Sequence, residues 1–331
     1  MTTKQDFCGG HCRGKMGGMT ARACGLALLL LSAGGLAQDR DPESAATCGQ
    51  CHKDQFREWQ GHGHATAWTN PVYQQALKGK SKPESCHACH IPAAVLERLG
   101  HRPQARARLR DEGVNCVACH RVGETMHGPF ECKTDAHATE KNPAFVGGGS
   151  SSLCASCHAT KIGPVLPVAK DFAESGLAEK GKTCAGCHMP EVERPLAFSL
   201  ATGKPVGEPR KSREHRILGP DDPEFVAKAF ALTVQATAAE IRVTVRNEAG
   251  HRVPGLTLRK FVVRLRQLTA DGKEARREKD HEIGSDLPLA AGESREIRLP
   301  RAPGATELDL AIDHVFADKT VATVVKRGTK L

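Results

Sequence analysis

The chain has 331 residues, of which 4% are aromatic, and it contains 14 cysteines and 16 histidines. At roughly 150 residues per domain, this length predicts about two domains, and a mean hydropathy of −0.40 excludes a polytopic membrane protein. The formal net charge is +9, but lysines and arginines are scattered along the chain, so we expect no nucleic-acid partner. So few aromatic side chains cannot fill a large core. The spacing of the cysteines must therefore indicate which other groups fill it.

Residues 1–37 are typical of a cleaved export signal. Four lysines and arginines precede an apolar run at 23–31, and mostly small residues fill positions 32–37. The apolar run has about nine residues, whereas a membrane-spanning helix needs about 20. We therefore expect the signal to be removed and the mature chain, beginning at Gln38, to be periplasmic or otherwise exported.

Five copies of the pattern Cys-x-x-Cys-His lie between residues 48 and 188. Two thiols separated by two residues can both add to the vinyl groups at one edge of a porphyrin, and the histidine that follows can bind the iron. A zinc site needs four ligands and gives no reason for a histidine after every second cysteine. The pattern therefore predicts five covalently bound haem c groups. The attachment cysteines are Cys48, Cys51, Cys86, Cys89, Cys116, Cys119, Cys154, Cys157, Cys184 and Cys187, and the proximal iron ligands are His52, His90, His120, His158 and His188.

The haems themselves are predicted to form the core of the domain at 38–190. The first cysteines of successive motifs are separated by 38, 30, 38 and 30 residues, a spacing that hints at haems packed in pairs. The five motifs share 141 residues, about 28 for each haem, which is too short a segment to build a core of its own. We expect short helices and loops around porphyrin faces, which supply the apolar surface that aromatic side chains usually provide.

The ligand on the other face of each iron decides between electron transfer and catalysis. A second protein ligand makes a low-spin electron carrier, whereas an open face admits a substrate. Only Met126 and Met189 follow the predicted signal, and methionine ligation raises the reduction potential, so we expect lower-potential irons held by pairs of histidines. The predicted distal iron ligands are His64, on the amphipathic stretch at 53–68, and His127, His137, His215 and His251.

The five remaining histidines are weaker candidates for iron binding. His101 is the main alternative to any of the predicted distal ligands, His87 lies inside an attachment motif, and His62 is two residues from a better candidate. His281 and His314 lie in the strand-rich tail of the chain, where we expect surface positions.

Residues 225–331 contain no cysteine and alternate as β-strands do. Ile241, Val243 and Val245 share one face, with polar residues between them on the other. Turn residues such as Asp271 followed by Gly272 separate the alternating segments. Six or seven strands in about 105 residues predict an immunoglobulin-like sandwich. The other predicted strands are at 231–236, 261–268, 295–299, 308–316 and 321–326.

The two domains are predicted to be joined in two ways. Residues 191–224, rich in proline, glycine and charge, predict an irregular linker. The turn at 247–254 lies between two predicted strands and holds His251, which we expect to reach over the haem domain and bind an iron. The fold class is therefore an α+β multidomain protein, with a mostly helical and loop-rich multihaem domain and an all-β tail.

The segment at 48–53, Trp59, His64 and the segment at 113–120 resemble the multihaem cytochromes grouped with the tetrahaem electron acceptor of hydroxylamine oxidoreductase. The resemblance covers roughly residues 45 to 190. It implies haems bound by two histidines each, stacked in pairs, with His64 as a distal ligand, and electron transfer in the periplasm. A fifth motif and the β-tail depart from the tetrahaem pattern; similar tails are appended to some exported multihaem cytochromes.

Two functions are compatible with these motifs. The first is a periplasmic carrier of electrons in a respiratory chain, exchanging them with redox proteins such as a quinol dehydrogenase or another cytochrome, with docking to a membrane protein as a further option. The second is a multihaem reductase or peroxidase acting on a small nitrogen compound or peroxide at one five-coordinate haem. Pentahaem nitrite reductases use a lysine-ligated haem, whereas every motif here ends in histidine. This difference favours the electron carrier, for which we expect no catalytic residues.

Overall fold

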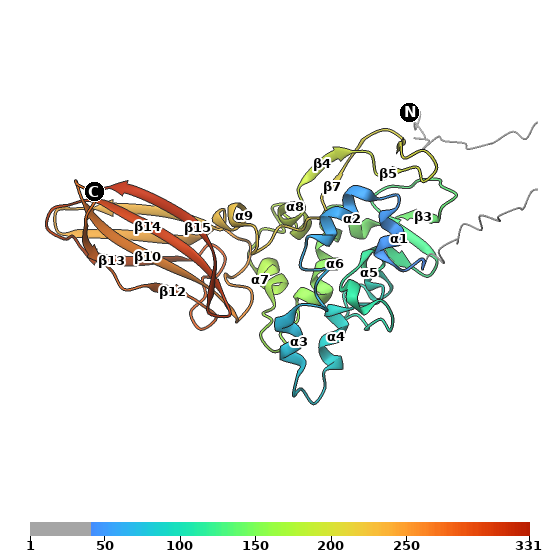
Figure 1. The fold of residues 1–331 in the computed structure, drawn as a ribbon, viewed down its shortest axis with the longest axis horizontal. Coiled ribbons are helices and arrows are strands. Elements are labelled where there is room, and N and C mark those ends of the chain that lie inside the picture. Colours follow the sequence, from blue (N-terminus) through green and yellow to red (C-terminus); the bar gives the residue numbers. More distant parts are fainter. Residues whose placement is uncertain (1–40) are drawn as a thin grey trace, which may run out of the picture.

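The computed structural model describes residues 41–331 and has two parts, shown in Figure 1. Short helices and loops form the N-terminal part, and long antiparallel strands form the C-terminal part, so the mixed helix and sheet composition is as expected. The predicted export signal lies outside the described residues. Within residues 41–331, no helix is both long enough and apolar enough to cross a membrane.

Each attachment motif lies at the end of a short helix. Four of these helices end at the proximal histidine itself, and the first motif begins in α1 and ends at the residue before α2. One helical turn places a residue and those three and four positions later on the same face, so both thiols and the imidazole of a motif point the same way. The motif helices are α1 (Ala45–Gly49), α4 (Glu84–His90), α5 (Cys116–His120), α6 (Gly149–His158) and α8 (Cys184–His188).

The connecting elements of the N-terminal part are also short. The helix α2 begins at Lys53 and ends at Gln60, so it covers only half of the predicted amphipathic stretch, because Gly61 and Gly63 end the regular turns. A small sheet has the strand order β1-β2-β3. These elements are α2 (Lys53–Gln60), α3 (Pro71–Leu77), η1 (Val95–Arg98), η2 (Arg110–Glu112), β1 (Arg121–Val122), β2 (Thr125–Gly128), β3 (Ala138–Lys141), η3 (Pro143–Phe145) and α7 (Val168–Glu174).

The segment at 191–224, predicted to be an irregular linker, contains two small antiparallel sheets, so that prediction is corrected. The strand β4 (Glu191–Arg194) pairs with β7 (Arg210–Arg213), and β5 (Ala197–Phe198) pairs with β6 (Pro205–Val206). Acidic residues of β4 lie opposite basic residues of β7, a cross-strand arrangement that stabilises such pairs. The helix α9 (Pro223–Ala227) ends the segment.

Two antiparallel sheets pack face to face in the C-terminal part. One has the order β11-β10-β14-β15, with β12 also paired to β10, and the other has the order β13-β9-β8. Every predicted strand is present, and the short β11 and β12 were not predicted. The strands are β8 (Phe230–Ala236), β9 (Glu240–Asn247), β10 (Arg259–Thr269), β11 (Glu274–Arg277), β12 (His281–Ile283), β13 (Ser294–Pro300), β14 (Ala305–Phe316) and β15 (Lys319–Lys330).

The hydrophobic core lies between these two sheets. Its buried members all fall between Val226 and Val324, and they come from both sheets. In the N-terminal part, buried apolar residues such as Ile91 and Val117 are scattered among the motif helices. This distribution fits a sandwich that folds on its own side chains and a helical part that needs other apolar groups to fill it.

His314 was predicted at the surface, but it is fully buried, so that prediction is wrong. It lies on β14, whose inward positions are otherwise occupied by apolar residues, and its Nε2 accepts a hydrogen bond from Arg259 Nη1 at 2.9 Å. Burial lowers the pKa of His314 to about 4, so the ring is neutral near pH 7. His281, on β12, is half-buried.

Candidate haem sites

Main-chain carbonyls orient the proximal imidazoles. Four of the five proximal rings have Nδ1 within hydrogen-bond distance of a backbone oxygen. A ring that donates through Nδ1 keeps its Nε2 lone pair free for a metal, and metal-binding histidines usually donate their other ring N–H in this way. The contacts are His52 with Leu196 O (2.8 Å), His90 with Ala67 O (2.7 Å), His120 with His127 O (2.7 Å) and His188 with Leu218 O (2.6 Å).

Four of the five predicted distal histidines face a proximal histidine. With metal–nitrogen bonds of about 2.0 Å, two imidazoles on opposite sides of one metal ion have ring centroids about 6 Å apart. All four observed separations match this value, so the side chains fit a haem iron between them. The facing pairs are His52 and His137 (6.4 Å), His64 and His158 (6.4 Å), His120 and His215 (6.0 Å), and His188 and His251 (6.2 Å).

Burial favours the neutral form of several of these rings. It lowers the pKa of His64 to about 3 and that of His215 to about 4, and it also lowers the pKa of His158 and His251. A neutral imidazole offers its lone pair to a metal, whereas an imidazolium does not. These four rings are therefore in the protonation state that iron binding requires at neutral pH.

A carboxylate on α2 positions His215. The Oε2 atom of Glu58 accepts hydrogen bonds from the main-chain N–H of His215 and from Arg194 Nη2, both at 2.8 Å. Burial alone would raise the pKa of Glu58, but these hydrogen bonds outweigh it and hold the pKa below its ordinary value. Glu58 thus links α2, the helix after the first motif, to the segment that carries His215. The ring of His215 faces His120, the proximal histidine of the third motif.

His251 is held against the N-terminal part by its neighbours. Arg252 donates to both carboxylate oxygens of Asp171 on α7, at 2.6 and 2.7 Å, and this guanidinium lowers the pKa of Asp171. At Gly250, any Cβ would lie 2.8 Å from the ring of Phe172 on the same helix, so only glycine allows this approach. The turn between β9 and β10 is therefore fixed where His251 meets His188.

His127 was predicted as the fifth distal ligand, and the structure places it differently. The residue is buried on β2, where its main-chain carbonyl accepts a hydrogen bond from His120 Nδ1. Its own ring lies near the Asn142 amide, with 3.5 Å between Nδ1 and Nδ2. In the part of the chain that the structure describes, no proximal ring faces His127. The hairpin of β1 and β2 places His127 beside the predicted proximal ligand His120, whereas a distal ligand would have to lie opposite it.

His90 has an aromatic neighbour instead of a facing imidazole. The ring of Tyr73 stacks on it with 3.6 Å between centroids and an interplanar angle of 7°. Over residues 41–331, no imidazole lies about 6 Å from His90 in the way seen at the other four motifs. Among the described residues, the buried Tyr73 hydroxyl has no hydrogen-bond partner. His101, the main alternative ligand, is exposed, and His87 packs its edge against Trp68.

Contacts between cysteines of different motifs give the spatial order of the attachment sites. The thiols of motifs 1 and 3, of motifs 2 and 4, and of motifs 4 and 5 lie close enough to shift one another's pKa, and Cys119 of motif 3 interacts electrostatically with both cysteines of motif 4. Motif 4 therefore adjoins motifs 2, 3 and 5. The contacting pairs are Cys48 with Cys116, Cys89 with Cys157, and Cys154 with Cys184.

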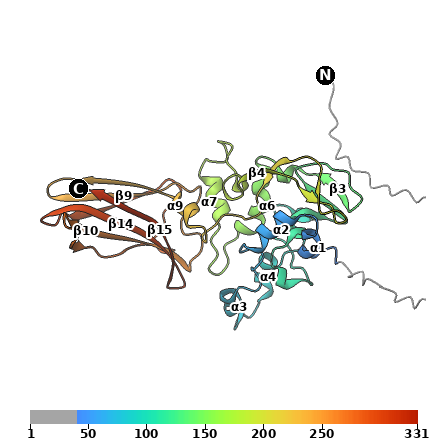
Figure 2. The same cartoon turned by 45° about the horizontal axis from the view of Figure 1, so that its top comes forward.

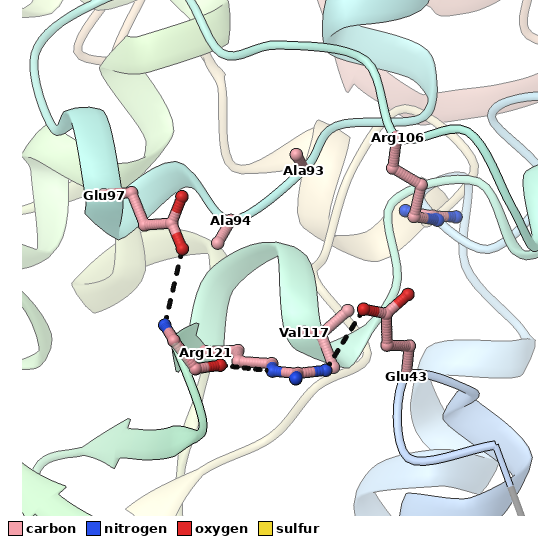
Figure 3. Close-up of a pocket in the computed structure, with 8 residues that line it drawn as sticks. Glu43, Ala93, Ala94, Glu97, Arg106, Val117 and Arg121 are labelled. Atoms are coloured by element: carbon pink, nitrogen blue, oxygen red, sulfur yellow. Dashed lines mark hydrogen bonds and ion pairs between the residues drawn. The ribbon is translucent and has the colours of Figure 1, made fainter.

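A cavity of about 240 Å³ lies beside the third motif (Figure 3). Its walls include Arg106 and the ion pair of Arg121 with Glu43, at 3.2 Å. The Arg106 guanidinium donates mainly to backbone carbonyls, among them those of Pro92 and Gly113, at 3.0 and 2.8 Å. These contacts stabilise the loop around the cavity and leave its charged groups satisfied. Within residues 41–331, no three His, Cys, Asp or Glu side chains converge as a metal site would require.

Residues 47–121, which contain the first three motifs, match the protein family described as cytochrome c554 and c-prime. The solved structure of a penta-heme cytochrome c552 from Thermochromatium tepidum is similar, with a TM-score of 0.65 and 18% sequence identity, over 87% of this chain and 98% of that one. The chain thus contains a cytochrome c554-type region and has the fold of a multihaem c-type cytochrome. The narrower relationship to the electron acceptor of hydroxylamine oxidoreductase stays a prediction.

No curated protein sequence matches the chain. Among other solved structures, the chicken interferon gamma receptor alpha chain is 12% identical over 31% of this chain and 50% of that one, with a TM-score of 0.21. The β-glucosidase 3B from Thermotoga neapolitana is 19% identical over 30% and 15%, with a TM-score of 0.17. Scores this low support no statement about the present chain.

Replacing Glu58 by Gln is expected to loosen the segment that carries His215. Losing charged hydrogen bonds worth about 1.5–3 kcal/mol should speed amide exchange at 210–216 by roughly ten- to a hundredfold, measured by mass spectrometry. Because the folded pKa of Glu58 is depressed, its stabilising effect is complete above the ordinary value of 4.5 and is lost as the pH falls through the lower folded value. Acid should therefore reduce the protection of these amides, measured relative to their intrinsic exchange rates at each pH, more in the wild type than in the variant.

The matched control for this variant is Glu191→Gln. Glu191 is exposed, and its ion pair with Lys211 on the same sheet is 3.9 Å long, so its removal should change exchange by less than about twofold. Equal acceleration in both variants would show that Glu58 has no special part in holding His215.

Proposed function

We propose that this protein is an exported pentahaem cytochrome that carries electrons. The main support for this proposal is the four facing histidine pairs. A c-type haem supplies an iron that takes up and releases one electron. The ten motif cysteines would hold five such groups, and each facing pair would close both axial positions of its iron. A site closed on both faces admits no substrate, and two neutral imidazoles favour a lower potential than methionine ligation does.

We infer the order of electron exchange from the thiol contacts. Motifs 1, 3, 4 and 5 follow one another in space, and motif 2 joins the row at motif 4. Under this proposal, motif 4 is a branch point. His64 and His158 would then hold the iron of motif 4. Electrons that move between motif 2, motif 5 and the pair formed by motifs 1 and 3 would pass through this iron.

The remaining parts of the proposal come from the sequence. We infer an export signal over 1–37, a haem domain over 38–190, a linker over 191–224 and a sandwich over 225–331. The proposed partners are redox proteins of a periplasmic respiratory chain, such as a quinol dehydrogenase or another cytochrome. The strand orders β13-β9-β8 and β11-β10-β14-β15 agree with an immunoglobulin-like topology, in which strands A, B and E share one sheet and C, F and G the other.

The second candidate function, a reductase or peroxidase, is favoured by one observation, the lack of a facing imidazole at His90. A haem held there by Cys86, Cys89 and His90 would keep one axial position for an added ligand. The buried Tyr73 hydroxyl nearby has no partner in the described chain and can donate a hydrogen bond. Burial raises the pKa of Tyr73 well above 10, so the phenol keeps its proton at neutral pH.

The electron-carrier proposal is tested first by counting haems. The protein purified from a host that exports it and attaches haem should give five haems per chain in a pyridine haemochrome assay, and dithionite should reduce them all. A variant with Cys184→Ala and Cys187→Ala should give four. A wild-type count below five, or haems that do not cycle between two oxidation states, would contradict the proposal.

Replacing His251 by Ala is expected to convert one low-spin haem to high spin, seen by electron paramagnetic resonance of the oxidised protein. His251→Met should restore a six-coordinate iron at higher potential, because thioether ligation favours the reduced state. His281→Ala, in the same sandwich but far along the chain, is the control and should leave the spectrum unchanged. Retention of every low-spin signal in His251→Ala would rule out iron binding by His251.

If the iron at His90 has an open position, the oxidised wild type should show one high-spin signal that shifts when cyanide, nitrite or hydroxylamine is added. The His251→Ala variant should then have two cyanide-binding haems. A wild-type spectrum that is entirely low-spin and unaffected by these ligands would remove the second candidate function and leave the carrier.

A further inference from the structure

The loop between α3 and α4 is strongly cationic. It carries Lys78, Lys80 and Lys82, and all three side chains are exposed. Figures 1 and 2 show α3 and α4 projecting together to one side of the N-terminal part, with this loop at the far end. We call residues 78–82 the lysine tip.

The charges of the lysine tip are not neutralised within the described chain. No ion pair joins Lys78, Lys80 or Lys82 to a carboxylate of residues 41–331. The surrounding segment at 70–104 has five lysines and arginines against two glutamates, Glu84 and Glu97. Several strand arginines of the sandwich, in contrast, are paired with nearby carboxylates, as Arg264 is with Asp313 and Arg266 is with Asp309. An unpaired cationic surface attracts anionic partners over a distance of about 10 Å at moderate salt.

The lysine tip adjoins the second attachment motif. Lys82 precedes Cys86 by four residues, and α4, which begins at Glu84, carries that cysteine in its first turn. Arg102 adds a further positive charge near Cys89, whose pKa it helps to lower. In a c-type haem the cysteines bind the vinyl edge, and the propionates project from the opposite edge. The lysines of the tip are therefore placed to meet an external anionic group rather than the propionates of this haem.

We propose that the lysine tip is the docking site of an acidic redox protein, which exchanges electrons with the haem of motif 2. This inference rests on the proposed electron-transfer function and adds the site and the charge of the partner. The tip projects instead of enclosing a pocket, so it fits the surface of a protein better than a small anion. One electron passes in each encounter, so one partner is oxidised and the other reduced, with no bond made or broken.

Charge complementarity should act chiefly on the rate of encounter. Focused electrostatic attraction raises association rates by about 10- to 1,000-fold and weakens as salt is added. Because motif 2 adjoins motif 4, docking here would deliver electrons to the proposed branch point in a single internal step.

The test uses the haem-loaded, full-length protein and a plant-type [2Fe–2S] ferredoxin, an acidic one-electron donor with a potential of about −400 mV. The variant Lys78→Glu, Lys80→Glu, Lys82→Glu reverses the charge of the tip. At an ionic strength of about 0.01 M, ferredoxin should bind this variant at least tenfold more weakly by calorimetry and reduce it at least tenfold more slowly by stopped flow. At about 0.15 M salt the difference should shrink, because the Debye length falls from about 30 to 8 Å.

The matched control is Lys319→Glu, Lys326→Glu, Lys330→Glu. These exposed lysines lie on β15 or at its ends, far from every motif in sequence, and the change in net charge is the same. The control should bind and react within about twofold of the wild type. Equal losses in both variants, or an unchanged tip variant, would overturn the docking proposal. So would an effect on hexacyanoferrate, a small anion, without an effect on ferredoxin.

Reduction by dithionite separates this proposal from the more general one. If dithionite reduces the haems of every variant while ferredoxin does not distinguish them, the docking site is wrong and the electron-carrier function stands. If no haem takes up electrons from dithionite, the electron-carrier function itself fails.

Discussion

The N-terminal part depends on pairs of imidazole rings that face each other about 6 Å apart. The chain must hold these rings in place although it has little hydrophobic core around them. The members of the four facing pairs are 63 to 95 residues apart in the sequence. Each pair therefore connects segments that no local interaction would bring together. An iron bound by both rings would act as a long-range crosslink, comparable in its effect on the unfolded chain to a disulfide that closes a loop of that length.

Local geometry explains why the attachment sites could be predicted and one distal ligand could not. A single helical turn determines a Cys-x-x-Cys-His site, so its five residues contain the whole signal. A facing histidine depends on how distant segments fold back, which its neighbours do not encode. His127 looked suitable because it follows His120 closely, yet the β1–β2 hairpin turns it to the same side. The stacking of Tyr73 on His90 depends on the packing of α3 against α4 and left no pattern in the sequence.

The sandwich was predictable for a similar reason, because alternation with a period of two is a local property. Its strands were found wherever inward positions are apolar. Alternation did not reveal that His314 takes an inward position, nor that β4 and β7, outside the sandwich, pair through opposite charges. In both cases the interacting partner lies elsewhere in the chain. Arg259 donates a hydrogen bond to Nε2 of the buried imidazole, and a basic strand lies opposite an acidic one.

The meeting of His251 with His188 also bears on how the protein is made. Cys184, Cys187 and His188 emerge during synthesis well before the turn of the sandwich that holds His251, and that turn takes its shape only when β9 and β10 are paired within their sheets. Haem could be attached at motif 5 early, but its second axial position would stay open until the last strands had folded and docked. Maturation would then have a fixed final step, in which the fifth site is completed only after the sandwich has folded and docked.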